Sequence, residues 1–144
     1  MRILGMLKAD KDSEAGAPPS RDLIERMGAF VEEATKAGVL AGGDWLQPSS
    51  KGKRVRLAGG KVTVIDGPFT ESKELVASYA LFEVKSMDEA VKWTKRFLEV
   101  LGRGECELRP IFEASDFPAD VVSPEEAARE ERTRQNMRKN TVPQ

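Results

Sequence analysis

The stretch that decides the fold is KVTVIDGPFTESKELVASYALFEVK, residues 61–85. It opens with an alternating strand, breaks at a Gly-Pro pair, and resumes after a polar loop as a second long strand over 75–85. Residues 54–57 alternate in the same way, and Gly59-Gly60 separates them from the first strand. This pattern predicts a β-hairpin placed directly before the long strand.

Amphipathic helices are expected on both sides of this stretch. Ser20 is a suitable N-cap for a helix with an apolar stripe at three- and four-residue spacing, and Gly38 is placed to end it. Ser86 and Glu89 form a capping box for the second helix, which Gly102 ends.

Further strands are expected over residues 1–8, 39–46 and 105–113, with a bulge or a close backbone approach at Gly42-Gly43. The charged and Gly/Pro-rich residues 9–20 predict a loop. Without the hairpin, the order of elements is βαββαβ, the ferredoxin-like arrangement of α+β proteins.

One sheet face would remain uncovered by the two helices. It would carry the following side chains: Tyr79, Leu81, Ile111 and either Leu4 with Met6 or Ile3 with Leu7. Such a face is too apolar for water, so we expect a homodimer with a chamber between two sheets, a dimeric α+β barrel.

The length of 144 residues fits one domain, expected over residues 1–117, with a C-terminal extension over 118–144. Ser123-Pro124 is a good helix start, but the residues that follow it form no apolar stripe. We therefore expect the extension to be a helix that frays.

The composition excludes several classes of protein. Lys+Arg at 23 against Asp+Glu at 24 argues against nucleic-acid binding and against a polybasic membrane anchor. The first apolar run stops at Leu7, too early for a signal peptide or a membrane span. The single cysteine, Cys106, permits no intrachain disulfide and is expected to act as a small core side chain. A cytoplasmic protein is the expectation.

Histidine is absent, which removes the usual general base near neutral pH, the Ser-His and Cys-His nucleophile pairs, and the commonest zinc ligand. The acidic residues Asp44, Asp66, Glu83 and Glu113 match no metal-binding spacing. No metal site and no cofactor are expected.

The run DGPFTESKE, residues 66–74, resembles the signature of the DGPF branch of the YCII-related family. Four further segments agree with that family's layout and occur in the same order along the chain. The first pairs residues 38–40 with the strand end at 46–48, and the others are the strand that holds Tyr79, the helix start at 88–90, and ELRP at 107–110. The resemblance covers about residues 1–117.

The resemblance implies a dimeric α+β barrel. Some relatives carry a His-Asp pair in the cleft between the sheets, from which an enzymatic role is inferred for them, and this chain has no histidine. Relatives are also often encoded beside extracytoplasmic-function sigma factors, which implies a regulatory association.

Asp66 is the candidate catalytic residue. At a strand end before Gly-Pro it could present a carboxylate to the cleft as a general base, with its pKa raised by desolvation. The same Asp-Gly-Pro sequence is also ordinary turn chemistry, in which the carboxylate makes an Asx-turn. Both interpretations stay open.

The candidate ligand-binding residues are Trp45, Phe69, Glu71, Lys73, Tyr79 and Arg109. Trp45 and Tyr79 could line the chamber or simply pack in the core. Glu71 and Lys73 could bind a polar ligand or pair with each other on the surface. Arg109 could hold a carboxylate in a fork, or pair with Glu83 or Glu107.

Two functions follow as expectations. The first is a homodimer that binds a small polar molecule or a regulatory partner at the cleft between the sheets. The alternative is a cofactor-free enzyme acting on a small polar substrate, with Asp66 as acid/base and Arg109 as anion holder.

Overall fold

The computed structural model describes residues 1–71 and 74–140. The chain divides into two compact units, Met1–Ile111 and Phe112–Gln144.

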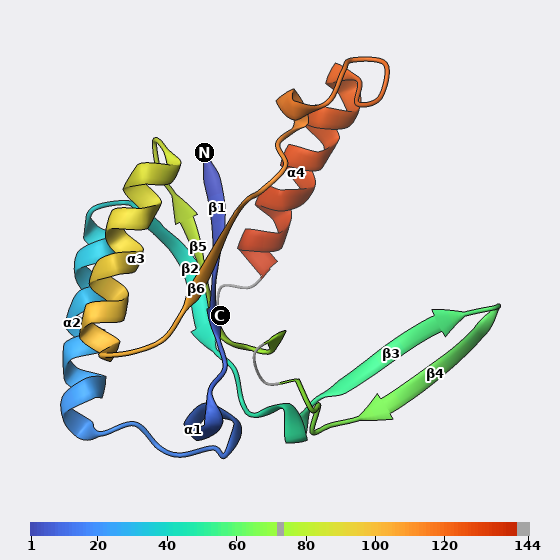
Figure 1. The fold of residues 1–144 in the computed structure, drawn as a ribbon. Helices are drawn as coiled ribbons and strands as arrows, with labels where there is room; N and C mark the ends of the chain where they lie inside the picture. Colours follow the sequence, from blue (N-terminus) through green and yellow to red (C-terminus); the bar gives the residue numbers. More distant parts are fainter. Residues whose placement is uncertain (72–73, 141–144) are drawn as a thin grey trace. The chain divides into compact units, whose positions relative to one another are not determined.

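The first unit is built on a four-stranded antiparallel sheet in the order β2-β5-β1-β6 (Figure 1). Its strands are β1 (Arg2–Lys8), β2 (Leu40–Trp45), β5 (Val76–Glu83) and β6 (Cys106–Pro110). The first and third strands of the βαββαβ unit, β1 and β5, lie in the centre and pair through Gly5 opposite Ala80. This strand order is the ferredoxin-like one, so the predicted α+β fold is confirmed.

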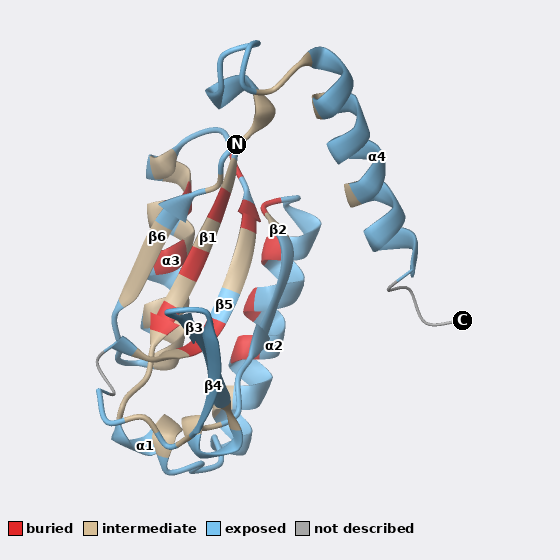
Figure 2. Ribbon diagram, turned by 90° about the vertical axis from the view of Figure 1, so that its right-hand side faces the viewer, coloured by how far each residue is buried: buried red, intermediate tan, exposed pale blue. Residues whose placement is uncertain are grey.

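Two helices, α2 (Arg21–Lys36) and α3 (Met87–Leu101), cover one face of the sheet (Figure 2). The predicted N-caps are confirmed: Ser20 Oγ accepts a hydrogen bond from the amide of Leu23 at 3.1 Å, and Ser86 Oγ accepts one from the amide of Glu89 at 3.2 Å. The other half of the predicted box differs, because Glu89 Oε2 accepts from the amide of Lys85, at 2.9 Å. Gly102 ends α3 in the left-handed conformation, at φ 84°.

The core lies between these helices and the sheet. Ile3, Phe82 and Ala90 are buried in it, together with Ala34 of α2. Because side chains alternate along β1, Ile3 and Leu7 face the helices and Leu4 and Met6 face the other way, which settles the alternative that the sequence left open. We call the second face, with Leu4, Met6, Tyr79 and Leu81, the outer face.

The predicted hairpin is confirmed and forms a sheet of its own. A short 3-10 turn, η1 (Ser49–Lys51), leads into β3 (Lys53–Ala58), which pairs with β4 (Lys61–Asp66). Gly59 and Gly60 both have positive φ, 58° and 76°, as a two-residue hairpin turn requires. Every residue of the two strands is exposed (Figure 2).

The expectation of a loop over residues 9–20 was wrong for residues 11–14, which form the helical turn α1 (Lys11–Glu14). A capping box stabilises it: Asp10 Oδ1 accepts from the amide of Ser13 at 2.8 Å, and Ser13 Oγ accepts from the amide of Asp10 at 2.9 Å. These local hydrogen bonds, three residues apart, outweigh the loop-forming composition around them.

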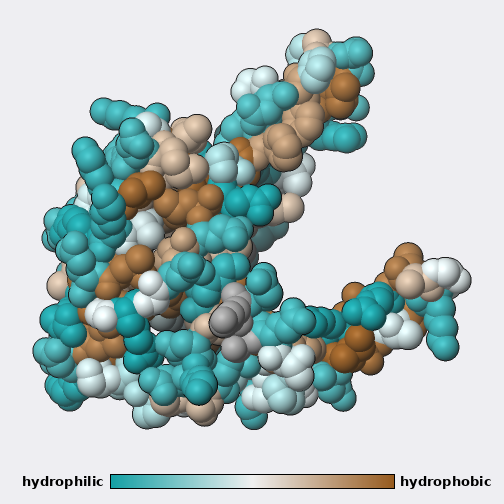
Figure 3. Space-filling view, in the orientation of Figure 1, coloured by the Kyte–Doolittle hydropathy of each residue, from teal (hydrophilic) through white to brown (hydrophobic). Residues whose placement is uncertain are grey.

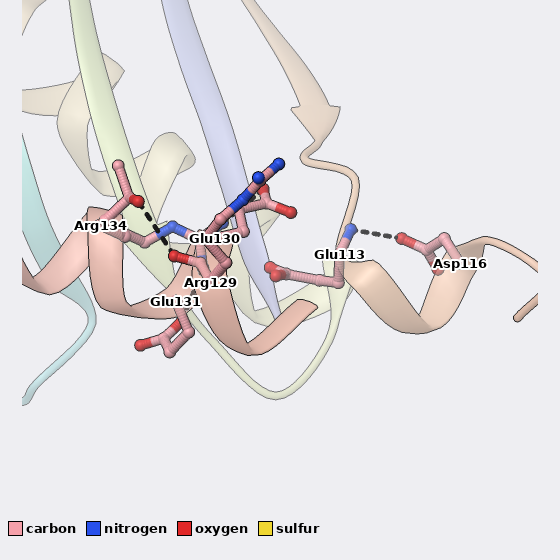
Figure 4. Close-up of polar contacts among 7 residues, drawn as sticks. Glu113, Asp116, Arg129, Glu130, Glu131 and Arg134 are labelled. Carbon is pink, nitrogen blue, oxygen red and sulfur yellow. Dashed lines mark hydrogen bonds and ion pairs between the residues drawn. The ribbon is translucent and has the colours of Figure 1, made fainter. Parts of the chain in front are cut away.

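The second unit contains η3 (Ala114–Asp116) and α4 (Pro124–Asn140). Ser123 and Glu126 make a reciprocal capping box, so the predicted helix start is confirmed. Arg134 pairs with Glu130 and Glu131, and Figure 4 shows these side chains on α4. The helix buries none of its residues, as its lack of an apolar stripe predicts.

None of the helices in the described part of the chain combines the length and the apolar character needed to cross a lipid bilayer.

Candidate functional site

A cavity of about 270 Å³ lies between the helices and the sheet. Residues from α2, α3 and all four strands of the main sheet line it. The lining is mainly apolar and includes Phe30, Val31, Trp45, Phe82, Thr94 and Phe97. Three aromatic rings converge here, because Phe97 lies 6.3 Å from Phe30 and 6.1 Å from Trp45 between ring centroids.

Thr94 brings a polar group into this apolar lining. Thr94 lies on the buried side of α3 and is only 9% exposed, and its Oγ1 has no hydrogen-bond partner among the described residues. A buried hydroxyl without a partner destabilises a protein by roughly 1–3 kcal/mol. Native proteins rarely leave such a group without a partner. Because Thr94 lines a cavity, a molecule bound there would be able to supply one.

The register of β2 turns Trp45 toward the helices. Leu40 is opposite Phe82 on the helix side, and a regular strand would place Gly42 and Asp44 on that side too. A bulge between Leu40 and Gly42 shifts the alternation, so that Gly43 and Trp45 face the helices instead.

Gly43 is required at this bulge, because it has φ 153° and a Cβ there would lie 2.6 Å from the carbonyl oxygen of Tyr79. The predicted bulge and close backbone approach are both confirmed. Trp45 itself is 55% exposed and forms part of the opening of the cavity to solvent.

Trp45 and Tyr79 both border the cavity, but only Trp45 turns its side chain toward the helices, whereas the side chain of Tyr79 lies on the outer face. The Tyr79 hydroxyl is 3.4 Å from Asp44 Oδ2 on the outer face. Arg109 is exposed and pairs with Glu107 at 3.3 Å, one of the two carboxylates named for that pairing. Glu71 is exposed, and Lys73 lies outside the described residues.

Asp66 lies apart from this cavity. It ends β4 directly opposite Lys53, and its carboxylate forms an ion pair with the Lys53 ammonium group. The side chain is 75% exposed. A catalytic role for Asp66 was expected to depend on desolvation of its carboxylate. In a single chain that carboxylate is open to solvent. The role itself stays a prediction.

Phe69, the last residue of the Gly-Pro-Phe segment after Asp66, lines a second, more open cavity of about 520 Å³. Ser49 Oγ donates to Glu14 Oε2 at 2.5 Å and accepts from the amide of Phe69 at 3.1 Å. The amide of Ser49 donates to Glu14 Oε1 at 3.0 Å, and the Arg54 guanidinium lies 4.0 Å above the Phe69 ring. These bonds link the base of the hairpin to α1, and the Ser49 hydroxyl both donates and accepts in them.

The apolar spacing of the second helix places Thr94 on its inward side, as found, but nothing in the sequence marks Thr94, Glu14 or Ser49 as a site residue. Glu14 and Ser49 are 35 residues apart, so no local pattern links them. The sequence gives no sign that the Thr94 hydroxyl lacks a partner, because the hydroxyl of a threonine on a helix ordinarily donates to the backbone carbonyl one turn earlier.

Cys106 begins β6 and also lines the first cavity. It is half-buried, and burial raises its pKa to about 11, with the nearby Glu105 carboxylate adding to the effect. The thiol is therefore protonated near neutral pH and is a poor nucleophile. Among the described residues, no group of three or more His, Cys, Asp or Glu side chains is arranged to hold a metal ion.

Comparison with known proteins gives the following relations. The family model for the YCII-related domain matches residues 1–115. Uncharacterized protein R00369 of Rhizobium meliloti (strain 1021) is 33% identical over 92 residues, which cover 63% of this chain and 71% of that protein.

A solved structure with a distant resemblance is the 5-chloro-2-hydroxyhydroquinone dehydrochlorinase of Burkholderia phenoliruptrix AC1100 in complex with 2,5-dihydroxybenzoquinone. It is 15% identical, with a TM-score of 0.43, and the match covers 82% of this chain and 100% of that one. The family match spans well over half of the 144 residues, and on this ground the chain belongs to the YCII-related family.

Proposed function

We propose that this YCII-related protein binds a small, mainly apolar molecule in the cavity between its helices and its sheet. The observation that carries the proposal is the unpartnered hydroxyl of Thr94 in the lining of that cavity. A ligand with one hydrogen-bonding group would satisfy this hydroxyl, while its apolar body would contact the rings of Phe30, Trp45 and Phe97.

The volume supports a ligand of one or two rings. A cavity of about 150 Å³ lined by aliphatic and aromatic side chains is large enough for benzene, and this one measures about 270 Å³. The ligand should be uncharged, because a charge in an apolar cavity needs a charged partner and Thr94 supplies only a hydroxyl.

This proposal differs from the expectation drawn from the sequence in both place and chemistry. The sequence suggested a small polar ligand in a cleft between two sheets, whereas the cavity of a single chain lies on the helix side of its sheet and is apolar. Catalysis by Asp66 forms no part of it, because that carboxylate is exposed and paired with Lys53.

The test compares two ligands that differ by one hydroxyl group. Naphthalene and 2-naphthol are titrated into the wild-type protein and into Thr94→Val, which keeps the shape of the side chain and removes its oxygen. We expect 2-naphthol to bind the wild type more tightly than naphthalene, by about tenfold or ~1.4 kcal/mol, as for a buried hydrogen bond.

In Thr94→Val this preference should disappear while the affinity for naphthalene is retained. Equal loss of both ligands, or no binding of either to the wild type, would contradict the proposal. Binding of 2-naphthol with the same preference in both proteins would show that Thr94 is not its partner.

We also propose that two copies associate through the outer face, as a cytoplasmic homodimer of the DGPF branch. Support comes from Leu4, Met6 and Leu81, which are apolar side chains turned away from α2 and α3. A stable dimer should bury more than about 1,200 Å² in total. Sedimentation velocity at micromolar concentration would measure it, and a single monomer peak would contradict it.

A further inference from the structure

One face of the hairpin is apolar and exposed. Val55 is directly opposite Val64, and Leu57 is directly opposite Val62. Because positions two apart share a face, these four side chains form one continuous patch, which we call the arm face. They are 59–71% exposed, and Figure 3 shows apolar side chains along the hairpin.

An isolated hairpin of this kind has little stability of its own. Two strands in water are marginally stable, and lasting order requires packing of a hydrophobic face against another layer. The high exposure of all four side chains shows that the described residues of the hairpin's own unit, Met1–Ile111, do not provide that layer.

The base of the hairpin is firmly held. The amide of Gly67 donates to the carbonyl of Gly52 at 3.0 Å, and Lys53 pairs with Asp66 across the first register position. Ser49 adds the links to Glu14 and Phe69 described above. A base fixed in this way presents the arm face in a defined direction, which lowers the entropy lost when the face is covered.

The charge of the hairpin is opposite to that of the rest of the chain. Residues 51–66, which we call the arm, contain five basic side chains and one acidic side chain, a charge of +4. With a net charge of -1 for the whole chain, the remaining residues carry -5. We call the residues outside the arm the body. The basic arm of one copy is therefore attracted to the acidic body of another copy, whereas two arms or two bodies repel each other.

We infer that the arm packs its apolar face against a second copy of this chain. The inference rests on the homodimer proposed above and adds to it a reciprocal contact, in which each arm reaches the body of its partner. Two-fold symmetry requires a self-complementary pair of surfaces, and one chain offers both: a basic arm with an apolar face and an acidic body.

The first experiment detects the contact directly. The photoreactive residue p-benzoylphenylalanine replaces Leu57 on the arm face or, as a control, Arg56 on the opposite face of the same strand. Chains labelled with nitrogen-15 are mixed with unlabelled chains, irradiated and examined by mass spectrometry. We expect crosslinks between labelled and unlabelled chains from position 57, at least fivefold more than from position 56. Crosslinks only within one chain, or equal yields at both positions, would overturn the inference.

The second experiment uses neighbouring substitutions of equal chemistry. Val64→Lys places a charge on the arm face, and Thr63→Lys places the same charge on the opposite face of β4. Sedimentation equilibrium should show the dimer dissociation constant raised at least tenfold by Val64→Lys and less than about twofold by Thr63→Lys. A wild-type monomer would contradict both the homodimer and the arm contact. A wild-type dimer that tolerates both substitutions equally would contradict the arm contact alone.

Discussion

The ring of Trp45 lies 6.1 Å from the ring of Phe97, centroid to centroid, with the planes inclined at 33°. This contact joins β2, at the edge of the sheet, to α3 beside the opening of the cavity. It depends on the bulge between Leu40 and Gly42, because without that extra residue Trp45 would point to the outer face.

Trp45→Ala should therefore weaken ligand binding more than it weakens the fold. We expect the affinity for 2-naphthol to fall about tenfold, and the free energy of unfolding to fall by only ~1 kcal/mol, the contribution of an aromatic pair. Titration calorimetry and urea unfolding would measure the two quantities. Trp45→Phe is the control and should retain most of the affinity. A loss of stability without a loss of affinity would remove Trp45 from the site.

Thr94→Val should stabilise the protein in the absence of ligand. The substitution removes a buried hydroxyl without a partner and keeps the side-chain shape, so the gain should be about 1 kcal/mol. For a chain of this length that corresponds to a rise in melting temperature of roughly 2–4 °C. Thr94→Ser keeps the hydroxyl and loses the methyl group, and it should lower the melting temperature. A lower melting temperature for Thr94→Val would show that the hydroxyl is satisfied in solution.

Gly67→Ala should disrupt the base of the hairpin. A Cβ at Gly67 would lie 1.8 Å from the carbonyl oxygen of Ser49, so the backbone of one of them must move. We expect a loss of about 3 kcal/mol, the upper end of the usual range for a single substitution.

Gly28→Ala is the matched control for that substitution. Gly28 lies inside α2 and has open space around its Cβ position, so alanine should stabilise the helix by ~1 kcal/mol. Thermal unfolding of the two variants should therefore shift in opposite directions. A Gly67→Ala protein as stable as the wild type would show that the hairpin base adapts easily.

Much of this fold could be predicted from the sequence because its signals are local. Ser20 and Ser86 begin the helices, Gly59-Gly60 turns the hairpin, and Gly42-Gly43 marks the bulge. Each of these signals depends on residues within a few positions of one another.

The site was only partly predictable. Trp45 and Tyr79 could be chosen as aromatic residues on strands, but the side of the sheet that Trp45 faces depends on where the bulge falls. Thr94 could not be found, because the lack of a hydrogen-bond partner is a property of the packed core. The Glu14–Ser49 contact joins α1 to η1, two short turns that only the folded chain brings together.

Removal of residues 123–144 should leave the melting temperature within about 2 °C of the wild type. None of the residues of α4 is buried, and its ion pairs between Arg134 and Glu130 or Glu131 are exposed pairs of the kind that contribute roughly 0–1 kcal/mol. Differential scanning calorimetry of the chain ending at Val122 would measure the change. A fall of many degrees would show that α4 packs on another surface, and sedimentation of the shortened chain would show whether that surface belongs to the dimer.

Cys106 provides a test of the fold and the cavity together. Its pKa is raised to about 11, first by burial and then by Glu105, whereas an unperturbed thiol has a pKa of about 9. A group whose folded-state pKa is raised adds stability that is fully present below the unfolded pKa and is lost as the pH rises through the folded pKa. Stability linked to Cys106 should therefore be constant below pH 9 and fall between pH 9 and pH 11. Cys106→Ala should lack this part of the pH dependence in urea unfolding.

The same shift predicts slow alkylation of the thiol. The thiolate is the reactive form, so iodoacetamide should modify native Cys106 slowly at pH 8, with a rate that rises up to about pH 11. Urea-unfolded protein should react faster at pH 8, because its thiol has lost the burial that raises the pKa. Since Cys106 also lines the cavity, saturation with 2-naphthol should slow the native reaction further at a fixed pH. At a concentration that half-protects the wild type, Thr94→Val should be protected much less, because about tenfold more 2-naphthol is needed to fill its cavity, although its thiol reacts normally without ligand. Equal protection in both proteins would place the ligand away from Thr94, and rapid alkylation at pH 8 without ligand would show that the thiol is not buried.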